Sequence, residues 1–195
     1  MKKTKNPKAK KETSQYRWAT TVFLLAVALS AALSLASESM LSGAGVVAAL
    51  LILGAFIALG IVFDILGVAV TAADPRPFHS MAAHKEKGAK EALSLLRNAS
   101  QVSSVCNDVV GDICGVVSGS ASATIASQIL THFTFSWPQV VSLVMSALVA
   151  ALTVGGKAIG KTFAIRSCTA IVHGVGKLIY TWNHFRALFR KKKDS

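Results

Sequence analysis

The stretch VSSVCNDVVGDICGVVSGSASATIASQI, residues Val102 to Ile129, is apolar and long enough to cross a membrane as a helix. It carries Asn107, Asp108 and Asp112 inside it, and a carboxylate near the bilayer centre costs roughly 2.5–3.5 kcal/mol on insertion scales. Asp108 and Asp112 share one helix face because they are four residues apart. We therefore expect these polar groups to face a bundle interior, a cavity or an ion path.

Three glycines of the same stretch, Gly111, Gly115 and Gly119, repeat at every fourth position. Small residues at this spacing let a second helix approach closely within a membrane. We expect the three to make a close helix contact, either inside the bundle or across a two-fold dimer.

The composition is that of a membrane protein. The chain has 195 residues, of which 52% are hydrophobic and 15% charged, and its mean hydropathy is +0.52. A net charge of +12 in a soluble chain would suggest a nucleic-acid partner. Here all 21 Lys and Arg fall into three blocks, Met1–Arg17, Arg76–Arg97 and Lys157–Lys193. Long runs without a basic residue separate the blocks, so we expect a multispanning protein with the lipid bilayer, and no nucleic acid, as its partner.

Uncharged runs predict four spans. Trp18–Ser37 is the first, and the short turn Glu38–Gly43 separates it from the second, Ser39–Phe63, which continues to Thr71. The uncharged run Ile113–Gly156 is too long for one crossing, and Thr131–Pro138 (THFTFSWP) interrupts it with aromatics, polar groups and a proline. The third and fourth spans therefore form a second hairpin.

With four spans, every basic block lies on one side of the membrane. Both turns, which hold no Lys or Arg, lie on the other side. The positive-inside rule then places both termini in the cytoplasm, and we expect a plasma-membrane protein. The alternative is that Trp18–Ser37 is a cleaved signal peptide, although its apolar part exceeds the usual core of 7–15 residues. Cleavage would leave three spans and an external N-terminus.

Cytoplasmic segments flank the spans. We expect Met1–Arg17 to be an unstructured basic tail. Lys85–Arg97 (KEKGAKEALSLLR) predicts a short amphipathic inner helix, and Lys161–Arg190 repeats apolar residues at helical spacing beside basic ones. The fold class is therefore an all-α integral membrane protein with four transmembrane helices, an amphipathic inner helix and a C-terminal juxtamembrane helix, followed by a basic tail at 191–195.

Motifs of enzymes and nucleotide sites lack their structural context. Gly155–Thr162 (GGKAIGKT) matches the phosphate-loop pattern, but that pattern needs a preceding strand and here follows an apolar span, so we expect no nucleotide. Cys106 and Cys114 are about 12 Å apart along a helix, beyond disulfide reach. Cys168 falls on the reducing side. Because no histidine has metal-ligand spacing and no Ser/His/Asp set shares a site, we expect no enzyme.

Four motifs follow one another along the chain: FDILGVAVTAAD at 63–74, GAKEALSLLRN at 88–98, VCNDVVGD at 105–112 and KAIGKT at 157–162. From Gly45 to Tyr180 the chain thereby resembles the DUF21 transmembrane domain of the CorB/CorC and CNNM family of magnesium-transport proteins. The first motif stands at the family's F-S-x-x-E-[TI]-A-L position, the third at G-N-N-x-x-N and the last at E-[VI]-[LI]-P-K-T. On this resemblance, residues 44–190 are the DUF21-like domain and residues 18–37 an extra N-terminal span.

The resemblance implies a protein of Mg²⁺ or Co²⁺ transport or homeostasis, a homodimer, and a site for partly dehydrated Mg²⁺ between the spans. Asp64 stands at the family's serine position, Asn107 is kept, and Asp108 replaces the second asparagine. These three side chains could supply the oxygen ligands that Mg²⁺ prefers. Mg²⁺, as bound or transported ion, is the one cofactor that we expect.

The chain also departs from the family pattern. The glutamate of the first motif is Gly67, and in the last motif Lys157 replaces the glutamate and Gly160 the proline. Because an ammonium group repels Mg²⁺ unless it is paired, we expect an Asp64–Lys157 ion pair at the inner mouth of the bundle. Two functions follow: a CorB/CNNM-like ion-transport protein, or a non-transporting membrane scaffold in which the Asp64–Lys157 pair replaces the ion site. Only a short basic tail follows the last predicted helix, so the family's CBS pair is not expected.

Overall fold

The computed structural model of the protein describes residues 7–41, 43–132 and 137–193, and the regular elements in these ranges are all helices. In chain order they are α1 Pro7–Leu41, α2 Val46–Ala72, α3 Pro75–Ala83, α4 Ala89–Arg97, α5 Ala99–Ser104, the π-helix η1 Val105–Gly111, α6 Asp112–His132, α7 Pro138–Arg166 and α8 Cys168–Lys193. Four segments are long and apolar enough to cross a membrane: Trp18–Leu41, Val46–Ala72, Ala99–Thr131 and Pro138–Arg166. The predicted all-α fold with four candidate spans is confirmed.

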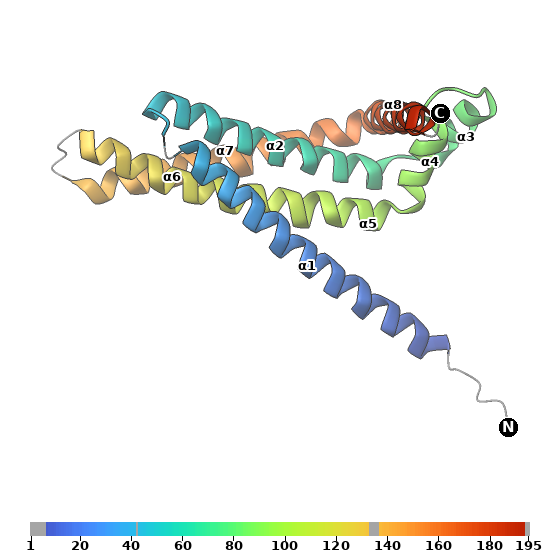
Figure 1. Cartoon of the computed structure of the whole chain (residues 1–195), viewed down its shortest axis with the longest axis horizontal. Helices are drawn as coiled ribbons and strands as arrows, with labels where there is room; N and C mark the ends of the chain where they lie inside the picture. Colours follow the sequence, from blue (N-terminus) through green and yellow to red (C-terminus); the bar gives the residue numbers. More distant parts are fainter. Residues whose placement is uncertain (1–6, 42, 133–136, 194–195) are drawn as a thin grey trace.

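The bundle is built around α2. Figure 1 shows α2, α7 and the continuous α5–η1–α6 segment running side by side, and α2 packs against all of them. Helix α1 crosses this bundle obliquely. The C-terminal part of α1 packs on α6, and its N-terminal part diverges from the bundle. The short helices α3 and α4 lie with α8 at one end of the bundle, which we call the inner end (Figure 1).

Apolar side chains form three clusters along the bundle. The cluster at the end opposite to α8 joins α1, α2, α6 and α7 through Leu41, Ala49, Leu53, Ile57, Ala121, Ile125 and Val149. The inner-end cluster joins α2, α3, α4, α7 and α8 through Ala69, Val70, Phe78, Ala92, Ala164 and Val172. The third cluster packs Val109, Ile113 and Val117 against α1. The polar groups of the third span therefore lie between two apolar clusters.

The inner end is held by a close contact between α4 and α8. Gly88 has a φ of +84°, and a Cβ there would collide with the backbone of Gly176 and Lys177. Only glycine adopts this conformation and allows this approach without cost. Helix α4 therefore begins at Ala89, after Gly88, and its buried residues Ala89 and Ala92 pack against protein.

Several boundaries differ from those predicted. The tail predicted as unstructured is helical from Pro7, where proline at the first helical position and the following Lys-Ala-Lys-Lys-Glu favour a helix. Helix α7 continues through Gly155–Thr162 to Arg166, so the phosphate-loop match is uninterrupted helix and Lys161 belongs to the fourth candidate span. Residues 1–6, 42, 133–136 and 194–195 lie outside the described residues, with the corresponding parts of the predicted tails and turns.

Candidate functional site at the contact between α2 and the π-helix

The third candidate span contains a π-turn where continuous α-helix was predicted. Val105–Gly111 forms η1, in which hydrogen bonds close over five residues rather than four. Such turns inside α-helices are frequent at functional sites. The turn holds Asn107 and Asp108 and ends where Asp112 begins α6.

Asn107 lies directly against Gly67 of α2. A Cβ on Gly67 would collide with Asn107 Oδ1 and would lie 2.8 Å from its Cγ. Asn107 Nδ2 donates a hydrogen bond to Ser103 Oγ at 3.3 Å. Its Oδ1 is buried and accepts no hydrogen bond from any residue that the structure describes. Glycine at position 67 thus makes room for a carbonyl oxygen that the fold leaves without a donor.

Asp64 lies one turn before Gly67 on α2 and is only 4% exposed. Its Oδ2 is buried and has no hydrogen-bond partner among the described residues. A Cβ on Gly60, one turn earlier, would lie 3.0 Å from Cys114 Cβ and 3.7 Å from Gly111 O. Asp64 therefore lies between two glycines that contact the third span. A buried carboxylate oxygen that accepts no hydrogen bond destabilises the folded state, so Asp64 is an unusual residue for this position unless a ligand or a proton satisfies it.

Lys157 pairs with Asp112 in place of the predicted partner Asp64. Its Nζ lies 3.7 Å from Asp112 Oδ1 and donates to Gly111 O at 3.5 Å. The physical reason is the packing of α7 on α2: Gly156 contacts Ile61 and Gly160 contacts Ile65, so α7 lies against the isoleucine face of α2. Lys157 then reaches the third span at Gly111, where no Cβ is in the way.

We had expected the two acids of the third span, Asp108 and Asp112, to face the bundle interior. They do not. Asp108 is exposed, and Ser104 Oγ donates to its Oδ2 at 2.8 Å. The side chain of Asp112 is 73% exposed, and its one salt bridge within the described chain is that with Lys157. The π-turn changes the rotation of the chain between Asn107 and Asp112, so predictions from a continuous α-helix misplace them. Of the three predicted ligands, Asp64 and Asn107 come to the same helix contact and Asp108 does not.

The glycine stripe is only partly a contact within the chain. Gly111 is buried, and a Cβ placed on it would lie 3.5 Å from Lys157 Nζ. Gly115 and Gly119 have open space where a Cβ would be. Inside one chain, the predicted close contact therefore holds at Gly111 alone.

Sequence reasoning missed Ser103 and the pairing of Lys157 with Asp112. It also missed Gly60 and Gly67, although their spacing with Asp64 is a signal, because positions i, i+4 and i+7 share one helix face. The described residues contain no group of three or more His, Cys, Asp or Glu placed to hold a metal. Any cation here would have few protein ligands and would keep waters.

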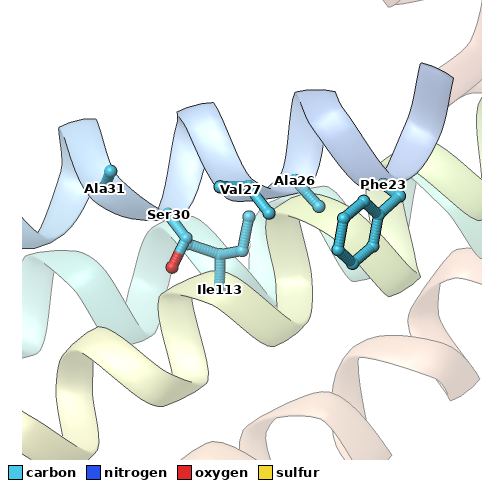
Figure 2. A pocket seen from close by; sticks show the side chains of 6 residues that line it. All are labelled: Phe23, Ala26, Val27, Ser30, Ala31 and Ile113. Atoms are coloured by element: carbon cyan, nitrogen blue, oxygen red, sulfur yellow. The ribbon is translucent and has the colours of Figure 1, made fainter. Parts of the chain in front are cut away.

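Two hollows lie elsewhere, between α1 and α6. Figure 2 shows the first, whose lining side chains are apolar except for one hydroxyl: Phe23, Ala26, Val27, Ser30, Ala31 and Ile113. The second adds polar groups, among them Glu38, Ser34 and Thr124. Neither is lined by Asp64 or Asn107, so both are separate from the α2–η1 contact.

Comparisons of the chain with protein-family models, with curated proteins and with solved structures gave no match. The assignment of function therefore depends on the residues themselves.

Proposed function

We propose that this chain is an integral protein of the plasma membrane, with four spans and both termini cytoplasmic. We further propose that it acts in Mg²⁺ or Co²⁺ transport or homeostasis like the CorB/CNNM proteins that its motifs resemble. The observation that carries the proposal is the pair of buried oxygens without donors, Asp64 Oδ2 and Asn107 Oδ1, on two helices in contact. An oxygen that accepts no hydrogen bond is available to a cation.

The electrostatics of Lys157 support a cation at this contact. An ammonium beside Asp64 would neutralise its carboxylate and repel a divalent ion. In the structure Lys157 is instead engaged by Asp112 and Gly111 O. Asp64 is thereby left without a paired ammonium among the described residues, and we assign Asp64 and Asn107 as ligands of a partly hydrated cation, with Asp108 outside this set.

Under this proposal, α4 and α8 lie on the cytoplasmic side as the amphipathic inner helix and the juxtamembrane helix. The protein forms a homodimer, for which the open face of α6 at Gly115 and Gly119 is a suitable surface. Asp112 lies on the same helix and is exposed, and a carboxylate facing lipid is costly, so coverage by a second copy would relieve that cost.

Thermal unfolding of the purified protein with and without Mg²⁺ tests the proposal. A cation at a hundredfold excess over its Kd stabilises the folded state by about 2.7 kcal/mol. Wild type should show saturable stabilisation by Mg²⁺ or Co²⁺, and Asp64→Asn and Asn107→Ala should each abolish it. Asp108→Asn is the matched control: it removes an acid from the same π-turn and should leave the effect intact. Saturable stabilisation that survives Asp64→Asn would refute the site.

A membrane scaffold without transport is the second candidate. The observation in its favour is that Asp64 is the one buried acid among the described residues, which contain no group of three or more His, Cys, Asp or Glu placed to hold a metal. The scaffold no longer depends on an Asp64–Lys157 pair. Wild-type protein whose unfolding temperature does not respond to Mg²⁺ or Co²⁺ at any concentration would favour it.

A further inference from the structure

Residues 177–186 of α8 are much less covered by protein than residues 168–176. Val172 is fully buried, and Gly176 packs so closely on α4 that an added Cβ would collide with Gly88 O. Beyond that point Leu178 is 71% and Trp182 65% exposed. These two are one turn apart on the same side, about 200° and 240° around the helix from Gly176. The exposed apolar stripe thus points away from the face that holds α8 on α4.

The helix that carries this stripe has only positive charge. The α8 sequence contains Lys177, Arg186 and a terminal run of one Arg and three Lys, with no Asp or Glu. Lys177 and Arg186 are both exposed. An apolar stripe with basic residues beside it is the pattern of helices that lie in the interface of an anionic membrane.

The place of α8 in the fold matches that pattern. It begins directly after Ser167, the residue that ends α7, and α7 is a candidate span. In Figure 1, α8 is seen nearly end-on while α2, α6 and α7 run lengthwise, so α8 runs across the bundle axis. A helix across the end of a spanning helix lies along the membrane surface.

We propose that residues 177–186 of α8 form a binding surface for anionic phospholipid, with Leu178 and Trp182 in the headgroup region and Lys177 and Arg186 on lipid phosphates. Trp is the residue most suited to this depth, and each Lys or Arg adds attraction to an anionic leaflet. The tether to α7 holds the stripe at the bilayer, which favours lipid over a soluble acidic partner. The proposal depends on the membrane placement proposed above and not on ion transport.

The test uses the full chain with Trp18→Phe and Trp137→Phe, which leaves Trp182 as the only fluorophore of its kind. The protein is reconstituted into vesicles of phosphatidylcholine alone or with phosphatidylglycerol. With phosphatidylglycerol, Trp182 emission should shift to the blue, be quenched by lipids brominated near the headgroup and be shielded from iodide. Lys177→Glu and Arg186→Glu should each lower the ratio of inserted to water-exposed Trp182 about fivefold or more. The same charge change at the exposed Lys90 of α4 is the control and should have little effect.

Three outcomes would overturn the proposal. Trp182 accessible to iodide in both vesicle types would mean that the stripe does not meet lipid. If Trp182 is shielded from iodide equally in both vesicle types, and salt does not change the shielding, the stripe makes an apolar contact that does not depend on headgroup charge. Shielding from iodide without quenching by brominated lipid would mean that protein, and not lipid, covers the stripe. Asp64→Asn should leave Trp182 quenching unchanged and Lys177→Glu should leave Mg²⁺ stabilisation unchanged, so either proposal can fail alone.

Discussion

Gly67→Ala should destabilise the bundle because of the contact between α2 and Asn107. The new Cβ would collide with Asn107 Oδ1 and lie 3.1 Å from Nδ2. Asn107 has little freedom to move aside, because its Nδ2 is hydrogen-bonded to Ser103 Oγ. Insertion of a methyl group into packed structure costs about 1–3 kcal/mol.

The matched control is Gly54→Ala on the same helix. Gly54 has open space where a Cβ would be, so this change adds only the helix propensity of alanine, a gain of up to about 1 kcal/mol. Both variants share that gain, and it cancels in their difference. The two unfolding temperatures should therefore differ by about 2–12 °C, with Gly67→Ala lower, if 1 kcal/mol corresponds to 2–4 °C at this chain length.

Buried cysteines provide the assay. Cys106 and Cys114 are 6% and 1% exposed, so a fluorogenic thiol reagent should react with them only when the bundle opens. Cys168→Ser removes the third thiol, which is half-buried. In an Asn107→Ala background the methyl group has room, and Gly67→Ala should then behave like Gly54→Ala. Equal unfolding temperatures of the two glycine variants in the wild-type background would show that Asn107 does not lie against Gly67.

Two further predictions concern the third span. In a double-mutant cycle of the free energy of unfolding, Asp112→Asn and Lys157→Met should be coupled by about 0.5–3 kcal/mol. The effects of Asp64→Asn and Lys157→Met should add within about 0.5 kcal/mol. Coupling in the second cycle and additivity in the first would restore the Asp64–Lys157 pair. Gly115→Leu should leave the stability of a monomer unchanged, because its Cβ meets open space, and should dissociate the proposed dimer, as measured by sedimentation in detergent. A dimer of unchanged stability would place the interface elsewhere.

The spans were predictable from sequence, whereas the partners of their polar groups were not. A run free of Lys and Arg reports the mean preference of about 20 residues for lipid, so small errors at the ends do not matter. The pairing of Lys157 depends on the rotation of α7 against α2, which Gly156 and Gly160 set through contacts with Ile61 and Ile65. No local pattern in the sequence contains that rotation.

The π-turn shows the same limit at the candidate site. In a continuous α-helix, Asp108 and Asp112 would share a face. One extra residue in a hydrogen-bonded ring rotates the following residues about the helix axis by about 100° relative to the preceding ones. Asn107 was expected to face the bundle interior, and it lies against Gly67 of α2. Because Gly67 is on another helix, the spacing within the third span did not indicate this neighbour. The choice of Asp64 as a site residue came from the family resemblance and from its charge, and its burial then became visible only in the packed structure.

The chemistry and the packing of the α2–η1 contact together narrow what it could bind. Its orphan groups are oxygen atoms, on Asp64 and Asn107, so a ligand must bring hydrogen-bond donors or positive charge. The helices approach each other through Gly60 and Gly67, where even a methyl group would meet atoms of the third span. An organic solute would have to separate α2 from η1 further than a small cation would, because a Mg²⁺ ion with its waters outside the glycine contact is smaller than a methyl group. Between the solutes that a membrane protein handles, the contact therefore favours a small inorganic cation, and the Lys157–Asp112 pair supports that choice because it keeps the nearby ammonium engaged elsewhere.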